Sequence, residues 1–560
     1  MSDRILVSVA WPYANGSIHI GHVAGTYLPA DIFARYHRKK GNDVLMVSGS
    51  DAHGTPVTLT AESQNISPED VYSKYQSEFL DCWDRLGISF DLFTSTHTDT
   101  HRKIAQDMFI KLYKAGYVYE QTMVQPYSEL DKRFLPDRYV EGTCPNCDYD
   151  SARGDQCDNC GRTLDAKDLI NIRSRISGDT PVFKETDHFF LKLSAFEDKL
   201  KQWIETKIKS GTWRPNVVNF THGFLEGGLR DRPITRDIEW GIPVPLPGYE
   251  QKRIYVWFEA VIGYLSASIQ WAKDRGEADS WKKWWQDPEA RAYYFMGKDN
   301  ITFHTVLWPA MILGYGGLNL PHDVPANEYL NLEGLKFAKS RNWAIWLREY
   351  LDRFEPDPLR YVVSSIMPET SDSDFTWREY VRRNNDELVA TYGNLVHRVL
   401  TISYRNFDKS VPKPSDLDDD CKKLLGEARE KFDDVGKHIE ACHFRSGLGA
   451  AMSLAQSVNR FLDKRAPWKT VKTNKQDAAD TLWTALTVIN CLKTALYPYL
   501  PFSSEKLHQL LNRPGAVQDI GWSWEPNELR PGEPLNEPKP LFVKLDERII
   551  AEEAARLETR

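Results

Sequence analysis

The sequence predicts an α/β domain built on a parallel sheet, with an insertion inside it and an all-α bundle after it. Three observations predict this fold. Strand, helix and strand patterns follow one another within the first 50 residues, the α/β pattern breaks from about 117 to 235, and the chain beyond about 375 is almost wholly helical in pattern.

The first unit of the predicted sheet lies at the N-terminus. Ile5–Val9 is a short, β-branched apolar run that ends in a turn-rich stretch from Trp11 to Gly16. Val23–Lys40 then places apolar and basic residues on opposite sides at helical spacing, and Asp43–Val47 has the pattern of a second strand. Such a βαβ unit predicts a parallel, Rossmann-like sheet.

The remaining elements follow from the same periodicities. Helices are expected at about 68–86 and 100–115, strands at 253–258 and 292–296, and a helix from Phe303. Amphipathic stretches at 380–405, 418–441, 444–463 and 476–497 predict the bundle. The proline-rich tail after 513 predicts an irregular strap with a final strand at 541–545, followed by a short charged helix at 552–556.

Composition and charge exclude several classes of protein. The 560 residues hold 71 Lys+Arg and 79 Asp+Glu, a formal net charge of −8, so a uniformly basic protein of the histone kind is excluded. No run of about 18 apolar residues is present, and the N-terminus lacks the pattern of a signal peptide. We therefore expect a cytoplasmic enzyme with neither a membrane nor DNA as partner.

A histidine motif follows the first strand. His19 and His22 flank Ile20 and Gly21 at a strand-to-helix turn, which is where parallel sheets bind ligands. The helix N-terminus there favours a phosphate, and two histidines three residues apart can donate to phosphate oxygens. Gly21 would let a nucleotide lie close to the backbone. The motif predicts a nucleotide site.

A lysine-containing segment provides the second motif. It runs Lys336-Phe337-Ala338-Lys339-Ser340, and alone it is a weak signal, because lysine-rich pentads are common on solvated surfaces. A loop with two lysines could close over a triphosphate and neutralise a departing pyrophosphate. The occurrence of this segment together with the histidine motif in one chain supports the prediction that it binds phosphate.

Four cysteines lie within 17 residues in the insertion. Cys144 and Cys147 form one Cys-x-x-Cys pair, and Cys157 and Cys160 form a second. Two such pairs predict one tetrahedral zinc ion, and four sulfur ligands leave no open position, so this zinc is structural. A redox pair is the alternative, which two spaced pairs disfavour.

The two motifs around His19 and Lys336 resemble the signatures of class I aminoacyl-tRNA synthetases. The lysine segment departs from the usual Lys-Met-Ser-Lys-Ser at Phe337 and Ala338, so a hydroxyl at position 338 is lost. Within that class the chain resembles the methionyl-tRNA synthetase family over about residues 5–545. Further matching segments are Ala10–Gly16, Ser50–Pro56, Tyr255–Trp257, Ile262–Tyr264, Gly297–Asp299, Phe303-His304, Tyr392–Leu395 with Arg398, and Ala466–Trp468.

The resemblance implies an activity and its ligands. It implies methionine activation by ATP and Mg²⁺, followed by transfer to the 3′-terminal adenosine of tRNA(Met). The implied catalytic residues are His19, His22, Lys336 and Lys339. Those implied to bind ATP are His19, Gly21, His22, Gly297, Asp299, Lys339 and Ser340. Those implied to bind methionine are Tyr13, Asp51, Trp257, Tyr264, Phe303 and His304, with Asp51 on the ammonium group. Those implied to read the anticodon are Asn394, Arg398 and Trp468.

The resemblance also implies a division of the chain. Residues 1–116 and 236–330 would be two halves of the catalytic domain, separated by a connective insertion with the zinc knuckle at 117–235. A lysine-loop and stem-contact region would occupy 331–385. An anticodon-binding bundle with its strap would occupy 386–545, and a charged tail 546–560.

Three alternatives stay open at this point. Synthetases for leucine, isoleucine or valine carry an editing insertion larger than the roughly 120 residues here, and a cysteine enzyme would hold zinc at its amino-acid site. A small-molecule adenylyltransferase shares the histidine motif but needs neither bundle nor knuckle. A catalytically dead tRNA-binding protein is favoured only by Phe337 and Ala338, and pyrophosphate exchange would distinguish it.

Overall fold

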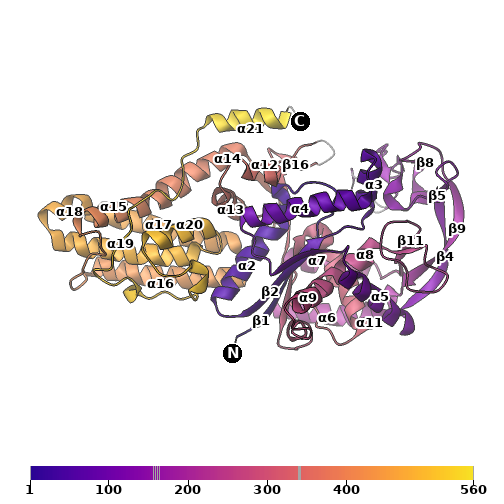
Figure 1. Ribbon diagram of the computed structural model, residues 1–560, viewed down its shortest axis with the longest axis horizontal. Helices are drawn as coiled ribbons and strands as arrows, with labels where there is room; N and C mark the ends of the chain where they lie inside the picture. Colours follow the sequence, from indigo (N-terminus) through magenta and orange to yellow (C-terminus); the bar gives the residue numbers. More distant parts are fainter. Residues whose placement is uncertain are drawn as a thin grey trace.

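The computed structural model describes residues 2–154, 157, 159, 160, 162, 164–338 and 342–558. Figure 1 shows three regions along the long axis: a helical bundle at one end, a parallel sheet with its helices in the middle, and a mainly β insertion at the other end. Among the described residues no helix is both long and apolar enough to cross a lipid bilayer.

The central sheet has five strands, all parallel, in the order β14-β13-β1-β2-β3. Their bounds are Ala326–Asn327 for β14, Arg291–Gly297 for β13, Arg4–Val9 for β1, Asp43–Ser50 for β2 and Leu92–Ser95 for β3. The predicted parallel sheet is confirmed, and the predicted strands at 5–9, 43–47 and 292–296 lie in it. In sheets of this kind ligands bind beyond the carboxyl ends of the strands, in the crevice where the strand order reverses, which here is at β1, between β2 and β13.

Helices cover both faces of this sheet (Figure 1). They are α1 (Ile20–His22), the π-helical turn η1 (Val23–Tyr27), α2 (Leu28–Lys39), α3 (Thr55–Gln64), α4 (Pro68–Leu86), α5 (Asp99–Lys114), α9 (Gly263–Asp274), α10 (Lys282–Trp285), η7 (Phe303–Leu307) and α11 (Trp308–Tyr315). The first three run on without a break from Ile20 to Lys39, as the apolar period predicts. The apolar residues of β1 from Ile5 to Val9 are fully buried beneath these helices.

The strand predicted at 253–258 is wrong for most of its length. Only Arg253–Ile254 forms a strand, β12, which pairs with β11 (Thr235–Arg236) outside the central sheet. Val256–Glu259 forms the helical turn α8. The run is apolar and rich in β-formers, but its tertiary surroundings override that local preference.

The insertion is built on a long antiparallel ladder. β4 (Val118–Ser128) pairs with β9 (Val182–Leu191), and β5 (Arg133–Phe134) and β10 (Arg232–Pro233) complete a four-stranded sheet. A smaller sheet of β6 (Val140–Thr143), β7 (Ala152–Arg153) and β8 (Ile170–Ser174) carries the cysteines. The helices α6 (Glu197–Ser210) and α7 (Pro215–Glu226) lead back to the central sheet.

The C-terminal region is helical, as predicted. Its helices are α12 (Leu347–Leu351), α13 (Pro356–Ser365), α14 (Trp377–Arg382), the π-helical η9 (Arg383–Gly393), α15 (Asn394–Asn406), α16 (Asp419–Glu440), α17 (Phe444–Arg465), α18 (Pro467–Thr473), α19 (Lys475–Leu496) and α20 (Pro501–Leu510). Every residue of α19 from Ala478 to Leu496 is buried, so this helix forms the centre of the bundle.

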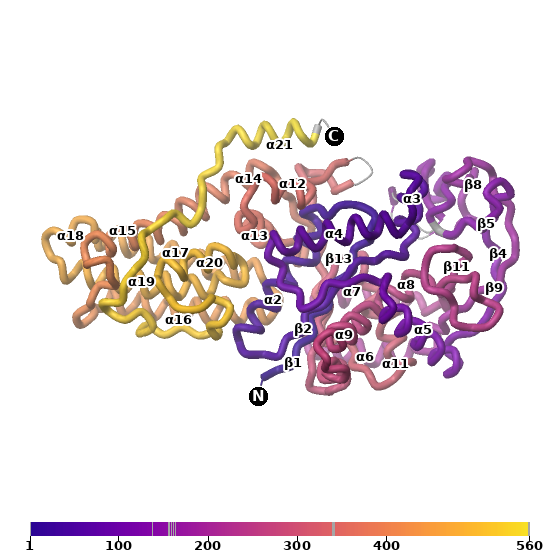
Figure 2. Tube along the Cα trace, viewed as in Figure 1, coloured from indigo at the N-terminus to yellow at the C-terminus, as the bar shows by residue number. Residues whose placement is uncertain are grey.

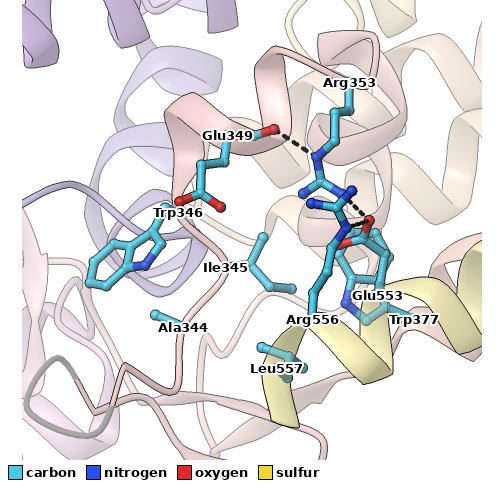
Figure 3. A pocket seen from close by; sticks show the side chains of 9 residues that line it. All are labelled: Ala344, Ile345, Trp346, Glu349, Arg353, Trp377, Glu553, Arg556 and Leu557. Carbon is cyan, nitrogen blue, oxygen red and sulfur yellow. Dashed lines mark hydrogen bonds and ion pairs between the residues drawn. The ribbon is translucent and has the colours of Figure 1, made fainter. Parts of the chain in front are cut away.

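The strap after α20 crosses the bundle without the predicted strand at 541–545. Side-chain amides replace a strand partner there, because Asn384 donates to the carbonyl oxygen of Val543 and Asn385 donates to that of Leu545. The chain ends in α21 (Arg548–Glu558), which returns over α12 and α14 (Figures 1 and 2). Figure 3 shows α21 beside residues 344–346, which follow the lysine segment.

Candidate active site

The histidine turn lies at the carboxyl end of β1. His19 caps α1, and its Nδ1 accepts a hydrogen bond from the Gly21 amide at 3.1 Å. Nδ1 of His22 accepts from the His19 amide, also at 3.1 Å. Because each Nδ1 accepts, this pattern assigns the ring proton of both histidines to Nε2. The turn therefore places two ring N–H groups beside the start of the helical segment that runs from Ile20 to Lys39.

Gly21 keeps the backbone of this turn accessible. A Cβ atom at Gly21 would lie 2.9 Å from the His19 imidazole and 3.2 Å from the ring of Phe337. A side chain at this position would therefore force its neighbours to move, as expected for a close-approach glycine.

The lysine segment lies directly on the histidine turn. It starts from a hairpin of β15 (Leu330–Leu332) and β16 (Leu335–Lys336), which exposes Lys336, and Ala338 and Trp343 exchange two backbone hydrogen bonds of 3.0 Å. The ring of Phe337 stacks on His19 with centroids 4.6 Å apart. The predicted site residues Lys339 and Ser340 lie outside the described residues.

The chain beyond the lysine segment is also bonded to the histidine turn. The Ile20 amide donates to the carbonyl oxygen of Ile345 at 3.1 Å, and the Leu347 amide donates to that of Ile18 at 2.8 Å. Two motifs that are far apart in sequence thus form one surface at the crevice.

Gly297 and Asp299 lie across the crevice, where β13 ends. Gly297 is the last residue of β13, and the exposed Asp299 lies in the following turn η6 (Lys298–Asn300). Tyr329 donates a hydrogen bond to Asp299, while Lys298 forms ion pairs with Glu328 at 2.7 Å and with Asp372. A carboxylate at this sheet edge can accept hydrogen bonds from the two hydroxyls of a ribose.

A cluster of aromatic side chains, which the resemblance implies as the amino-acid pocket, adjoins this edge. Nδ1 of the buried His304 lies 2.8 Å from the Asn300 carbonyl oxygen, so it donates there, and Nε2 accepts from the Tyr264 hydroxyl at 2.7 Å. Burial lowers the pKa of His304 to about 4, which keeps the ring neutral. Trp257 meets Phe303 edge to face at 5.1 Å and is 38% exposed. The pocket is apolar, with one fixed polar pair at its base.

Asp51 lies at the other side of this pocket, at the end of β2. It pairs through the backbone with Tyr13, whose ring lies 2.2 Å from where a Cβ of Gly54 would be. Asp51 is buried, and burial together with the charge of Glu259 raises its pKa to about 8, against the influence of His53. A buried carboxyl with this pKa is stabilised as an anion by an incoming cation.

Sequence reasoning missed a charged network beneath the pocket. Glu259 is fully buried and contacts His53 Nδ1 at 2.9 Å and His101 Nε2 at 3.3 Å. The two histidines outweigh the effect of burial and lower the pKa of Glu259 to about 2. The one sequence signal for this network was the position of His53 in the matched segment Ser50–Pro56.

Trp11 lies in the matched segment Ala10–Gly16, where sequence reasoning made it a weaker assignment to the methionine pocket than the residues named above. Its indole ring fills a slot between β2 and the start of α9, because a Cβ at Gly49 or at Gly263 would lie 2.2 or 2.6 Å from it. The ring also meets Tyr264 edge to face at 6.3 Å. Trp11 thus forms part of the pocket wall.

The four cysteines of the insertion come together as predicted. Their sulfur atoms all lie within 4.8 Å of one another, with 4.0 Å between Cys144 and Cys160 and 3.6 Å between Cys147 and Cys157. A tetrahedral site with metal–sulfur bonds of about 2.3 Å has sulfur–sulfur edges of about 3.8 Å. The donor set therefore fits a single metal ion.

The residues predicted to read RNA belong to α15 and α18, whose labels lie at the end of the bundle away from the central sheet (Figure 1). Asn394 is exposed at the start of α15. The guanidinium of Arg398 lies 5.2 Å from the ring centre of Trp468, which starts α18 and is 36% exposed. Asn459 accepts from Arg398 at 3.1 Å and fixes its direction. This surface offers an aromatic face and polar groups together, far from the histidine turn.

Comparisons with known proteins agree with this arrangement. The family model described as "tRNA synthetases class I (M)" matches residues 5–400, and "Anticodon binding domain of methionyl tRNA ligase" matches residues 411–560. The methionine–tRNA ligases of Thermomicrobium roseum and Dehalococcoides mccartyi are 53% and 54% identical, over 100% of this chain and 99% and 100% of theirs.

A solved structure is similar over nearly the same length. It is the Mycobacterium tuberculosis methionyl-tRNA synthetase in complex with methionyl-adenylate, with a TM-score of 0.80 and 25% identity. The match covers 97% of this chain and 100% of that chain.

Proposed function

The chain belongs to the methionine family of class I tRNA synthetases, and from this premise we propose that it is a methionine–tRNA ligase. In the first step the methionine carboxylate attacks the α-phosphorus of ATP, the bond to the β-phosphate breaks, and pyrophosphate leaves. In the second step the terminal hydroxyl of tRNA(Met) attacks the carbonyl carbon of the adenylate and loses its proton, and AMP leaves. The products are methionyl-tRNA, AMP and pyrophosphate.

The histidine turn would stabilise the first transition state. Nε2–H groups of His19 and His22 donate to phosphate oxygens as negative charge shifts toward pyrophosphate, and Gly21 lets the nucleotide lie against the backbone. Lys336 adds a positive charge from the hairpin, and Lys339 and Ser340, outside the described residues, complete the proposed set. Mg²⁺ would neutralise phosphate charge when bound with ATP. Gly297 and Asp299 would hold the ribose.

The aromatic pocket would select methionine. Tyr13, Trp257 and Phe303 offer aromatic faces to an unbranched thioether, and such contacts contribute about 0.3–1.5 kcal/mol each. The Tyr264–His304 pair is neutral and leaves no unpaired charge beside the side chain. Asp51 would bind the ammonium group, because burial makes a cationic partner favourable for it.

The cysteine cluster would hold one structural Zn²⁺. Cys144, Cys147, Cys157 and Cys160 provide all four ligands, so no coordination position remains for a substrate. When bound, zinc would supply folding energy to the small sheet of the insertion.

The bundle would read the anticodon. Trp468 offers a stacking face for an unpaired base, while Arg398 and Asn394 offer donors and an acceptor for base edges. Recognition of this kind uses splayed, single-stranded bases, which an anticodon loop provides.

One observation supports this proposal most strongly. The histidine turn and the Phe337 hairpin meet at the crevice, beside the Tyr264–His304 pair. It is tested by amino-acid-dependent ATP–pyrophosphate exchange with each of the twenty amino acids. Exchange with methionine alone is expected. Exchange with a different amino acid would contradict the pocket assignment, and no exchange from a folded, zinc-loaded sample would favour a non-catalytic tRNA-binding protein.

A further inference from the structure

The charged network beneath the aromatic pocket is centred on Glu259, which the proposed reaction does not use. Glu259 is fully buried and lies in α8, two residues after Trp257. Its carboxylate oxygens lie 2.9 and 3.1 Å from Nδ1 of His53, on the turn after β2. One of them also lies 3.3 Å from Nε2 of His101, in the first turn of α5. One carboxylate thus joins three elements that are distant in the sequence.

His53 carries the positive charge that balances Glu259. An ionised carboxylate only accepts hydrogen bonds, so Nδ1 of His53 donates to it. Nε2 of His53 lies 3.1 Å from Nδ1 of His97, whose pKa is lowered by burial and by the charge of His53. Burial also lowers the pKa of His53, but the charge of Glu259 outweighs burial and raises it. We therefore assign protons to both ring nitrogens of His53, with a neutral His97 as acceptor.

The pair of Glu259 and His53 lies next to the proposed ammonium site. The backbone amide of His53 donates to Oδ1 of Asp51 at 3.2 Å, within the turn that both residues share. Burial and then the charge of Glu259 raise the pKa of Asp51, whereas the charge of His53 lowers it. The charge on Asp51 therefore depends on both members of the pair.

Two further contacts hold this arrangement in place. The indole of Trp240 stacks on His97 with ring centres 4.7 Å apart, and its Nε1 donates to the carbonyl oxygen of Ala52 at 2.6 Å. In α9, the hydroxyl oxygen of Ser266 lies 2.8 Å from Nδ1 of His101. Both outer histidines are thus fixed by neutral groups, and the turn after β2 is tied to the elements around it.

The other ionisable groups around the pair come from the turn after β2, from α4, from the turn after β3 and from α5. They are Asp51, Glu69, His97 and His101. Glu69 is exposed on α4, so solvent and salt screen its charge. Glu259 and His53 are buried, and their charges act on Asp51 with far less screening.

Stability alone does not account for a buried charged pair. Removing two charges from water costs free energy, and apolar residues of similar volume are often as stable or more stable. This pair instead lies beside Asp51, where a cation is expected to bind.

We propose that Glu259 is a positioning residue for methionine binding, which acts through His53: the two side chains hold the turn that carries Asp51 and set the charge that Asp51 presents to the amino group. This inference rests on the proposed function and extends it to a residue that acts only through others. It predicts that the two members of the pair have opposite effects on the pH dependence of methionine binding.

The test is the dissociation constant for methionine from about pH 5.5 to about pH 8.5, measured by calorimetry for the wild-type protein and two variants. His53→Asn keeps a donor at the Nδ1 position and removes the positive charge, so the charge of Glu259 acts on Asp51 unopposed. At pH 7 its dissociation constant is expected to be about tenfold larger than that of the wild type. Its affinity should still be rising at the upper end of the pH range.

Glu259→Gln is expected to act in the opposite direction. It keeps the shape of the side chain and removes the charge that most favours a protonated Asp51. The pH above which affinity stops rising should therefore fall by about one unit. Glu259→Asp keeps the charge and is expected to restore the wild-type profile.

The direction of these two movements separates positioning from packing. Damage to the pocket alone would weaken binding by one factor at every pH. Profiles that stay in place, or that move in the same direction in His53→Asn and Glu259→Gln, would overturn the inference. Glu69→Gln is the matched control, because it removes one negative charge at an exposed position of α4 and should leave the profile unchanged. If Glu259→Gln does not fold, His53→Asn decides, and a profile that does not move upward overturns the inference.

Pyrophosphate exchange gives a second readout and separates this inference from the proposed function. In His53→Asn at pH 7 the KM for methionine is expected to rise about tenfold, while the KM for ATP stays within about twofold. Equal rises in both would contradict an action through Asp51. A wild-type protein without methionine-dependent exchange would contradict the proposed function itself. A wild-type protein that exchanges, with variants whose pH profiles do not move, would overturn only the role of Glu259.

Discussion

The ring of Phe337 stacks on the imidazole of His19, with centroids 4.6 Å apart and planes inclined by 7°. This contact joins the hairpin of the lysine segment to the histidine turn. Phe337 stands where related synthetases usually have methionine, so the stack replaces a flexible side chain with a rigid aromatic one. The substituted position thus retains a structural role beside the proposed nucleotide site.

Replacing Phe337 with alanine is expected to raise the KM for ATP about three- to tenfold in pyrophosphate exchange. An aromatic pair of this kind contributes about 0.5–1.5 kcal/mol, and without it the hairpin spends less time against His19. Leu335→Ala on the same hairpin is the control, because Leu335 is 54% exposed. An unchanged KM for Phe337→Ala would contradict a role of the stack in nucleotide binding.

The hydrogen bonds of His22 predict different outcomes for its two amide variants. Nδ1 of His22 accepts from the His19 amide, which puts the ring proton on Nε2, the atom proposed to donate to phosphate. His22→Gln can place a donor near the Nε2 position, whereas His22→Asn can replace only the Nδ1 acceptor. We expect Asn to lower kcat of adenylate formation about 100-fold or more and Gln to retain several-fold more activity. Equal loss in both variants would argue against the Nε2 assignment.

The raised pKa of Asp51 predicts a pH dependence of methionine binding. Its pKa is about 8 in the ligand-free protein, against an ordinary value near 3.8, because it is buried and faces Glu259, with His53 acting in the opposite direction. Below pH 8 the ligand-free protein therefore holds a proton that a bound ammonium group must displace. Affinity for methionine is expected to rise up to about tenfold per unit between about pH 6 and pH 8.

The raised pKa of Asp51 also makes the stability of the ligand-free protein depend on pH. Between pH 4 and pH 8 the folded carboxyl keeps its proton while the unfolded one loses it, so this group makes the ligand-free protein less stable as pH rises. Asp51→Asn should flatten this dependence and abolish methionine binding. Calorimetric titration in two buffers of different ionisation enthalpy measures the released proton. No proton release at pH 7 would contradict this account.

The parts of the fold that sequence predicted are those where several local signals agree. The strand Ile5–Val9 and the helix from Val23 to Lys40 have matching residue preference, period and boundaries. At 253–258 and 541–545, apolar β-formers alone suggested strands. In the first case tertiary packing produced α8, and in the second the side chains of Asn384 and Asn385 bonded the backbone instead.

The candidate active site, like the fold, could be predicted from sequence only in part. The cysteine cluster could be predicted because its spacing alone determines the geometry, and the other predicted residues came from matched motifs. The bond between His53 and Glu259 spans 206 residues and has no local pattern. The Phe337–His19 stack is equally non-local. Contacts of this kind join residues that are far apart in the sequence, so they can be identified only from the folded structure.

Cys147→Ser is expected to remove the metal from the insertion and to destabilise its small sheet. Three thiolates and a hydroxyl are a poorer zinc site than four thiolates, and the apolar contacts of Cys144 and Cys157 depend on the closed cluster. Metal content is measured by elemental analysis of the purified protein. Cys82→Ser is the control, because Cys82 is buried in α4, away from the cluster. Full zinc content in Cys147→Ser would contradict the four-cysteine site.

The C-terminal helix α21 lies beside residues 344–346, which are bonded to the histidine turn. Glu553 is 5% exposed and forms an ion pair with Arg353, which also donates to the Glu349 carbonyl oxygen at 3.0 Å (Figure 3). Burial and the neighbouring Arg556 lower the pKa of Arg353. Arg353 and Glu553 line the pocket drawn in Figure 3, and Ile345 lines it too. The carbonyl oxygen of Ile345 accepts a hydrogen bond from the Ile20 amide.

Glu553→Ala is therefore expected to loosen α21 by about 1–3 kcal/mol, because it leaves Arg353 without its carboxylate. Hydrogen exchange of the α21 amides should accelerate about 5- to 100-fold through local opening. Glu552→Ala is a close control, because its side chain is exposed one residue earlier on the same helix. If α21 supports the site, the KM for ATP should rise in Glu553→Ala only. Equal protection of α21 in the two variants would show that the helix is held by its apolar residues, such as Leu557, rather than by the ion pair.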